Sequence, residues 1–278
     1  MLARNAICGW LHLLILTPAV LAETSPAKYQ VKIDRLYKIG GTVAIQSSGD
    51  QTLTTTPNGG PAQTIRFSAT LTGTITINEV SPVSGLPTKF DLTVATCQRD
   101  GKDLFPTNAL VSAAFSGGPS YTYQGNTVSQ DASDALNVLL IAIGPIAPFD
   151  PPIEDSVFGT AAPKKSGDLW QIDGNVAAPV MAHSLNMVIS PTDASGVTLV
   201  TSVNTNSITV KGTLNIKNLS VPQKVASGTI TQISEWDLPT DLSKRPTRQK
   251  DSIDIVLVGS DSKSETIQTD LSSLQSAP

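Results

Sequence analysis

The sequence predicts a mainly β protein of the α+β class, with a curved antiparallel sheet or open barrel wrapped around one central apolar helix. Two long segments, 64–77 and 207–218, alternate apolar and polar residues, as strands with one buried and one solvated face do. Glycine and proline turns separate such segments along the chain. One segment, 129–144, has helical spacing instead.

The N-terminus resembles a secretory signal peptide over residues 1–22. Arg4 precedes an apolar run over residues 7–21, which ends in the cleavage pattern Val20-Leu21-Ala22. Pro18 interrupts the run, which is shorter than a membrane-spanning helix needs to be. We therefore expect an exported protein, periplasmic, outer-surface or extracellular, with no transmembrane segment in the mature chain. An uncleaved N-terminal anchor is the alternative.

Composition narrows the classes of function. The net charge is −4 and only 15% of residues are charged, which argues against a nucleic-acid partner. The mature chain, 23–278, is long enough for one β-rich domain. Two lobes, 27–128 and 156–270, are the alternative, joined by the helix 129–144 and a proline-rich crossing over 145–156.

The strands follow from alternation. In segment 64–77 the odd positions from Ile65 to Ile77 are apolar or glycine, and the even positions are polar. One solvated face is typical of antiparallel sheets. Shorter strands are expected at 29–33, 42–46, 89–97, 184–189, 196–203, 227–236 and 252–259.

The predicted helix begins at a cap, Ser129 or Asp131, and ends at Gly144-Pro145. Its later turns are apolar on nearly all sides, which predicts burial. We expect it to cover the apolar side of the strands. Its apolar positions at helical spacing are Ala132, Ala135, Leu136, Leu139, Leu140 and Ile143.

Catalytic chemistry has few candidate residues. After removal of the leader, His183 and Cys97 are the remaining histidine and cysteine. A serine or cysteine hydrolase would need His183 as its base, but His183 is expected at the start of a strand. Cys97 is expected to be buried or half-buried, on the face shared with Thr93 and Ala95. A secreted hydrolase therefore stays a minor alternative, and we assign no catalytic residue.

No cofactor is expected, and no metal site is assigned. One histidine and one cysteine cannot complete a zinc site without two carboxylates. Calcium prefers oxygen ligands, and Asp150, Glu154 and Asp155 lie in one acidic stretch, although without a known calcium-loop spacing. Whether this stretch binds calcium is left open.

A basic stretch at 244–250 is a candidate surface for an envelope component. Such a loop can meet an anionic surface such as lipid headgroups or acidic polysaccharide. The alternative is a charged hairpin that prevents edge pairing between molecules. Its basic residues are Lys244, Arg245, Arg248 and Lys250.

The phrase PKKSGDLWQID, residues 163–173, predicts a tight turn at Ser166-Gly167-Asp168 followed by a strand. Trp170 is expected to pack against the rim of the sheet, with the lysines in water. We interpret the phrase as a structural corner.

Four features together carry a resemblance. They occur in this order: the segment YQVKIDRLYKIGGTV, a long alternating strand, the mid-chain stretch SDALNVLL, and the corner PKKSGDLWQI. This arrangement resembles a diffuse group of bacterial exported β-rich envelope proteins of unknown function. The resemblance implies an envelope protein without an assigned activity and identifies no catalytic residue.

Two hypotheses of function remain. A sheet around a helix is similar in architecture to periplasmic carriers that hold lipid acyl chains, an analogy of fold alone. In the first hypothesis the protein is a binding module that holds an apolar small molecule between sheet and helix. In the second, the threonine-rich outer face binds a partner or serves a structural role. The ligand-binding candidates are Leu136, Leu139, Leu140, Ile143 and Trp170.

Overall fold

The computed structural model describes residues 27–82, 84–115, 118–140, 153–185, 187–221, 226–259 and 263–276. The strands of its main sheet are β2 (Thr42–Thr56), β3 (Gln63–Val80), β4 (Pro87–Arg99), β5 (Lys102–Asp103), β6 (Ala109–Ala114), β7 (Ser120–Tyr123), β8 (Asn126–Thr127), β10 (Leu169–Gln171), β11 (Ala194–Val203), β12 (Ser207–Val221), β13 (Ala226–Pro239), β14 (Arg248–Gly259) and β15 (Ser264–Ser276). A separate pair consists of β1 (Tyr29–Val31) and β9 (Thr160–Lys164). The predicted signal peptide lies outside the described residues.

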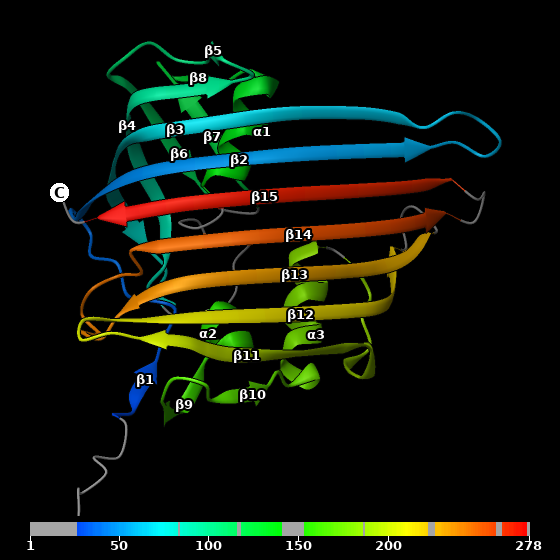
Figure 1. The fold of residues 1–278 in the computed structure, drawn as a ribbon. Helices are drawn as coiled ribbons and strands as arrows, with labels where there is room; N and C mark the ends of the chain where they lie inside the picture. The colour runs from blue at the N-terminus through cyan, green and yellow to red at the C-terminus, as the bar shows by residue number, and fades with distance from the viewer. Residues whose placement is uncertain are drawn as a thin grey trace, which may run out of the picture.

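The main sheet is antiparallel and open. Its strands follow the order β10-β11-β12-β13-β14-β15-β2-β3-β4-β6-β7-β8, with β5 paired to β4 (Figure 1). The two ends of this order, β10 and β8, are not paired with each other, so the sheet does not close into a barrel. The prediction of a mainly β, antiparallel fold is confirmed.

Three α-helices are described, α1 (Gln130–Leu139), α2 (Ile153–Phe158) and α3 (Gly174–Leu185), together with a short 3-10 helix, η1 (Pro191–Asp193). In Figure 1 the three α-helices lie behind the sheet. The pairing register agrees, because residues directly opposite each other on antiparallel strands share a face. Gly49, Leu271, Asp251, Ser234 and Gly212 are successive partners across five strands. We call their side of the sheet the inner face.

The inner face carries two hydrophobic clusters. The first joins α1 to β2, β3, β4, β6 and β7, and includes Leu71, Phe90 and Leu136. The second joins α2 and α3 to β1 and strands β11 to β14, and includes Phe158, Leu214 and Trp236. The two stretches that the sequence suggested as lobes therefore each have a hydrophobic cluster, and both contribute strands to one sheet.

Helix α1 begins where the sequence predicted. The Ser129 side chain accepts a hydrogen bond from the backbone N–H of Ala132 at 3.3 Å, which caps the helix. The predicted continuation through Ile143 to Gly144 lies outside the described residues. Ala135, Leu136 and Leu139 are completely buried against the sheet.

The expectation of one central helix is not confirmed. The inner face carries α1 in the first cluster, and α2 and α3 in the second. Helix α3 also replaces the start of the strand predicted at 184–189, of which the structure keeps an isolated bridge between Val188 and Ser220. The predicted crossing over 145–156 lies mostly outside the described residues, and α2 begins within it, at Ile153.

Strand β15 joins the two halves of the sheet. It pairs with β14 on one side and with β2 on the other, from Ser264 opposite Thr56 to Ser276 opposite Ala44. The sequence did not predict this strand, because its inward positions include Thr269, Ser273 and Gln275 and so lack an apolar alternation.

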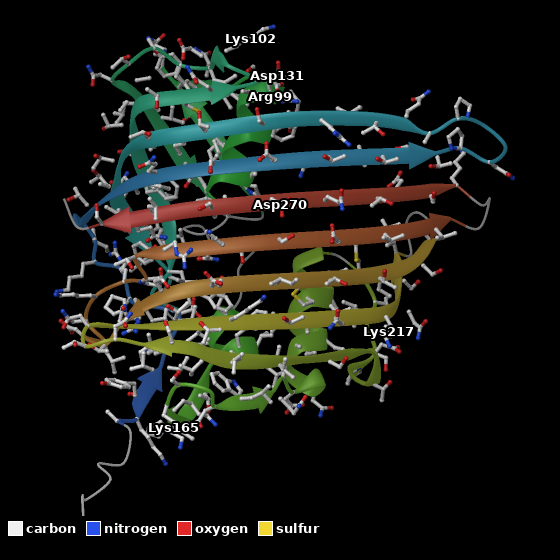
Figure 2. All side chains as sticks on the ribbon, viewed as in Figure 1. Arg99, Lys102, Asp131, Lys165, Lys217 and Asp270 are labelled. Atoms are coloured by element: carbon white, nitrogen blue, oxygen red, sulfur yellow. The ribbon has the colours of Figure 1, made fainter. Side chains whose placement is uncertain are left out.

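The outer face is polar and faces the viewer in Figure 2. Strand β3 exposes or half-exposes Thr70, Thr72, Thr74 and Thr76 on this side. Near the middle of the face, Asp270 of β15 stands directly opposite Asp50 of β2. The outer face therefore has the solvated character that the alternation predicted.

Gly49 on the inner face of β2 lies directly against Val138 of α1. A Cβ atom at this position would lie 2.5 Å from Cγ1 of Val138, closer than packed atoms can approach. We expect Gly49→Val to lower the free energy of unfolding by about 1–3 kcal/mol, because the added side chain overpacks the contact. Urea denaturation measures the change. Ser48→Val, on the outer face of the same strand, is the control and should change the stability by less than about 0.5 kcal/mol; equal effects of the two substitutions would contradict the contact.

Candidate functional site

A strip of buried polar side chains occupies the inner face of the three middle strands, between the two hydrophobic clusters. We call it the polar strip; it consists of Ser47, Gln249, Asp251, Thr269 and Ser273. The hydroxyls of Ser47 and Ser273 are hydrogen bonded across β2 and β15 at 3.1 Å. Gln51 extends the strip by donating to Oγ1 of Thr269 at 3.2 Å. Buried polar groups need such partners, since an unsatisfied one costs about 1–3 kcal/mol.

The side-chain amide of Gln249 connects helix α2 to the polar strip. Nε2 of Gln249 donates to Oε1 of Glu154 and to Oδ2 of Asp251, each at 2.9 Å. Gln249 therefore joins a carboxyl group of α2 to a carboxyl group of β14. Oδ1 of Asp251 has no hydrogen-bond partner among the described residues.

The segment between β1 and β2 also contacts α2. The backbone N–H of Ile33 donates to Oδ1 of Asp155, and the backbone N–H of Asp155 donates to Oδ2 of Asp34 at 2.8 Å. These bonds connect the start of the described chain to α2. Together Asp34, Glu154, Asp155 and Asp251 form what we call the carboxyl cluster.

Burial shifts the carboxyl cluster toward its protonated form. Desolvation raises the pKa of both Asp34 and Asp251 to about 6, from an ordinary value of 3.8. Burial also raises the pKa of Glu154 well above 4.5, and the charges of Asp34 and Asp251 act in the same direction. The pKa of Asp155 is raised by burial as well, against the hydrogen bonds from Ile33 and Asp34. Burial therefore favours the protonated form of each carboxyl group in this part of the inner face.

Arg35 lies close to Asp155, but no ion pair joins its guanidinium to the carboxyl cluster within the described residues. Arg35 as a whole is 4% exposed, and its Nη2 donates to the carbonyl of Pro239 at 3.4 Å. Nε and Nη1 have no partner in the described part of the chain. Burial lowers the pKa of Arg35, while the charges of Asp155 and Asp241 raise it.

The predicted ligand-binding residues separate into two places. Leu136, Leu139 and Leu140 lie together in the first hydrophobic cluster, where each is completely or almost completely buried. Trp170 packs against the second cluster. Ile143 lies outside the described residues.

The corner at 163–173 has the predicted turn and following strand, but its lysines are half-buried, and Lys164 lies over the ring of Trp170 instead of in water. Gly167 has a φ of 84°, and the backbone N–H of Lys165 donates to Oδ2 of Asp168 at 3.0 Å. Trp170 lies on the edge strand β10, and its indole N–H donates to the carbonyls of Phe158 and Gly159 at 3.2 and 3.1 Å. The tryptophan thus fixes the end of α2 to the edge of the sheet.

The basic stretch divides into paired and exposed side chains. Arg248 forms ion pairs with Glu235 at 2.6 Å and with Asp237 at 2.7 Å. The guanidinium of Arg245 stacks over the ring of Tyr37, 3.7 Å from its centroid. Lys244 and Lys250 are exposed. Two of the four predicted basic residues therefore have contacts within the protein.

The cysteine and histidine candidates lie in different elements, Cys97 in β4 and His183 in α3. Cys97 is completely buried in the first cluster, on the same face as Leu92 and Val94. The prediction that Cys97 shares a face with Thr93 and Ala95 is wrong. An irregularity in the β3–β4 pairing leaves two successive residues exposed, Ala95 and Thr96, so the alternation changes side before Cys97. Burial raises the pKa of Cys97 to about 12, so its thiol is not reactive at neutral pH. His183 lies in α3.

The calcium hypothesis finds no support in the described residues. Glu154 and Asp155 point to different partners, Gln249 and Ile33, and Asp150 lies outside the described residues. Within the described ranges, no group of three or more histidine, cysteine, aspartate or glutamate side chains is placed to hold a metal ion.

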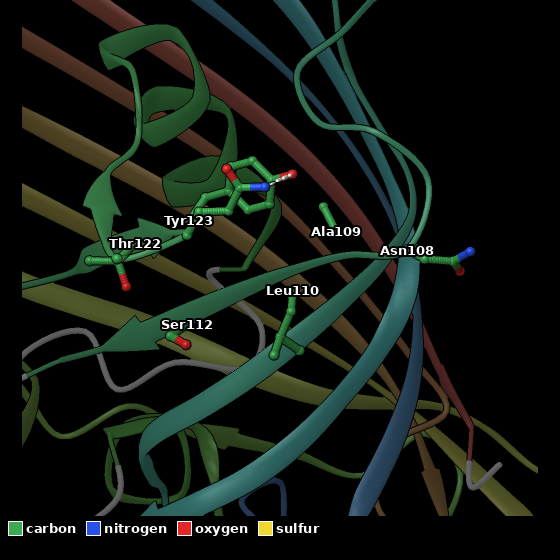
Figure 3. A pocket seen from close by; sticks show the side chains of 8 residues that line it. Asn108, Ala109, Leu110, Ser112, Thr122 and Tyr123 are labelled. Atoms are coloured by element: carbon green, nitrogen blue, oxygen red, sulfur yellow. Dashed lines mark hydrogen bonds between the residues drawn. The ribbon is translucent and has the colours of Figure 1, made fainter.

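A shallow depression of about 440 Å³ lies between β6 and β7 (Figure 3). Nε2 of Gln124 donates to the hydroxyl of Tyr123 at 3.1 Å across its rim. Its lining is uncharged and includes Asn108, Leu110, Ser112, Thr122, Tyr123 and Gln124. It is separate from the polar strip, and we assign it no function.

Comparison with known proteins does not identify a family. No protein-family model matches the sequence, and no curated protein matches it. Among solved structures, an outer membrane channel from Pseudomonas putida F1 is 12% identical, with 91% of this chain and all of the channel covered, at a TM-score of 0.22. An engineered protein studied for asymmetric conductivity is 10% identical, with 84% of this chain and all of that protein covered, at a TM-score of 0.19. Both TM-scores are too low to indicate a shared fold. None of the described helices is long and apolar enough to cross a membrane.

Proposed function

We propose that this protein is an exported, non-catalytic binding module of the bacterial envelope, and that it binds a hydrophobic ligand on the inner face of its sheet. The leader-like N-terminus supports export. The observation that supports ligand binding is an apolar row that continues across the inner face beyond the side chains buried in the second cluster. We call it the aliphatic row.

The aliphatic row follows directly from the pairing register. Its members are successive partners across six strands and therefore share the inner face: Ile216, Ile230, Ile255, Ile267, Leu53 and Ile65. Ile216 and Ile230 are buried in the second cluster. Ile255, Ile267 and Leu53 are half-buried, and Ile65 is 63% exposed. The row thus passes from covered core to accessible apolar surface.

This surface lies beside the helices rather than beneath α1. The contact between Gly49 and Val138 leaves no space for a ligand at that point. An acyl chain or similar apolar group laid along Leu53, Ile267 and Ile255 would remove apolar area from water, which contributes about 25 cal/mol per Å². The ligand class that fits the row is therefore an elongated aliphatic molecule.

The test is binding of an apolar fluorescent probe to the folded mature protein. We expect the wild type to enhance the fluorescence of the probe, and Leu53→Asp with Ile65→Asp to weaken this binding by at least about tenfold, because two charged groups would then line the apolar row. The matched control is Val256→Asp with Val258→Asp, which alters two exposed apolar residues of the outer face. Circular dichroism verifies the folding of each variant. Absence of probe binding to the folded wild type, or an equal loss in the control, would refute the proposal.

A further inference from the structure

We propose that one end of the molecule docks on the surface of an anionic lipid bilayer. Three connections form this end: residues 32–41 before β2, residues 81, 82 and 84–86 between β3 and β4, and residues 240–247 between β13 and β14. In Figure 1 they lie together at the left end of the sheet. This proposal does not depend on ligand binding by the aliphatic row.

A cation–π contact and two hydrogen bonds hold the three connections together. Arg245 stacks on Tyr37, and Arg35 donates to the carbonyl of Pro239. The backbone N–H of Tyr37 donates to the carbonyl of Gly85 at 3.1 Å. Connections that are far apart in sequence therefore form one continuous surface.

Large apolar side chains project from this end into solvent. Leu36 is 69% exposed, Ile39 is 67% exposed and Leu242 is 41% exposed. Leu36 and Ile39 are more exposed than any other large apolar side chain in the described ranges. Exposed apolar side chains gathered at one place indicate an interaction surface.

The charges around these side chains indicate which partner. Lys38, next to Ile39, and Lys244, two residues after Leu242, are exposed, and Arg245 is half-buried over Tyr37. The one exposed acid of the connection 240–247, Asp241, accepts hydrogen bonds from the backbone N–H and the hydroxyl of Ser243 at 2.9 and 2.7 Å. Apolar side chains bordered by basic ones are the combination by which peripheral proteins bind anionic membranes, since the apolar groups enter the interface and the cations meet lipid phosphates.

The experiment is cosedimentation of the mature protein with vesicles of phosphatidylcholine alone, or of phosphatidylcholine mixed with phosphatidylglycerol. We expect binding to the anionic vesicles, weaker binding at raised salt, and little binding to the neutral ones. Lys38→Glu with Lys244→Glu should reduce binding by at least about tenfold, because each basic residue near an anionic surface contributes about 1 kcal/mol. Leu36→Ser with Ile39→Ser should reduce it to a similar extent.

Matched controls test whether vesicles bind at this end of the molecule. Lys211→Glu with Lys217→Glu changes two exposed lysines of β12 and should bind as the wild type does. Val256→Ser with Val258→Ser should also leave vesicle binding unchanged, as should the Leu53→Asp, Ile65→Asp variant made for the probe test. Failure of the wild type to bind anionic vesicles, retained binding in either variant of this end, or self-association through this end without vesicle binding would overturn the proposal.

Discussion

Replacement of Asp251 by asparagine is expected to raise the free energy of unfolding at pH 7 by up to about 3 kcal/mol. Asp251 is 5% exposed, and burial raises its pKa from 3.8 to about 6. At pH 7 the folded protein must therefore hold a buried carboxylate that would be better protonated, and the pKa difference corresponds to about 3 kcal/mol at 1.36 kcal/mol for each pH unit. Asparagine removes this charge at nearly constant volume.

The pH dependence gives the sign of the effect. Because the folded state holds the proton more tightly than the unfolded state, the stability associated with Asp251 is highest below about pH 4 and decreases as the pH rises to about 6. Above pH 6 the loss is constant. The raised pKa of Asp34 lowers the stability over the same pH range. Burial beside Asp34 and Asp251 also raises the pKa of Glu154. The wild type should therefore lose stability between pH 4 and 6, and Asp251→Asn should flatten this decrease.

Urea denaturation at a series of pH values measures this prediction. Asp254→Asn, which removes a carboxylate from the outer face of the same strand, is the control. Gln249 donates a hydrogen bond to Asp251, Ser234 lies directly opposite it on β13, and the charge of Asp251 raises the pKa of Glu154. An Asp251→Asn variant that is less stable than the wild type at pH 7, with an unaltered pH profile, would show that the carboxylate is stabilised in a way that the burial argument misses.

Truncation of Leu136 to alanine is expected to lower the free energy of unfolding by about 2–5 kcal/mol. Leu136 is completely buried between α1 and the sheet, and such a truncation loses both apolar burial and packing contacts. The matched control is Leu110→Ala, since Leu110 on β6 is 55% exposed and its truncation should cost far less.

The same variant tests whether the two hydrophobic clusters unfold together. Trp170 and Trp236 are the tryptophans of the mature chain, and both belong to the second cluster, whereas Leu136 belongs to the first. One continuous sheet predicts that Leu136→Ala shifts the unfolding transition seen by tryptophan fluorescence as much as the transition seen by circular dichroism. A fluorescence transition that stays at the wild-type midpoint would show that the clusters unfold independently.

The strands that the sequence predicted are those with clear alternation. Segment 64–77 became β3 because its odd positions face a hydrophobic cluster and its even positions face solvent. Strand β15 alternates Ile267, Thr269, Leu271 and Ser273 on the inner face, and this mixture of apolar and hydroxyl groups gave no periodic signal. Its place in the sheet depends on pairing with β2, more than 200 residues away, which a local pattern cannot show.

The helices show the same limit. Ser129 caps α1 as predicted, because a cap and its helical spacing are local properties of the sequence. Helix α3 was missed because it starts at Gly174 and contains Pro179, two residues that ordinarily argue against a helix interior. Pro179 is the sixth residue of α3, beyond the first turn in which proline is tolerated, and the packing of Ala177 and Ala178, both completely buried, stabilises the helix around it.

The carboxyl cluster was predicted only in part. The sequence drew attention to Glu154 and Asp155 as an acidic stretch, but not to Asp34, Gln249 or Asp251. One signal was present, because Gln249 and Asp251 occupy the same alternating positions of β14 as Ile253 and Ile255 and so had to face inward with them. What surrounds them depends on α2 and residues 32–35, whose positions follow from tertiary contacts alone.

The placement of β15 between β14 and β2 also affects how the molecule is assembled during its synthesis. Until residues 264–276 have been synthesised, the edge of β2 that pairs with β15 has no neighbouring strand, and its backbone hydrogen bonds on that side remain unformed. Contacts between such distant parts of a chain slow folding and leave strand edges open to aggregation. We therefore expect a chaperone to keep the nascent chain unfolded until β15 has been synthesised.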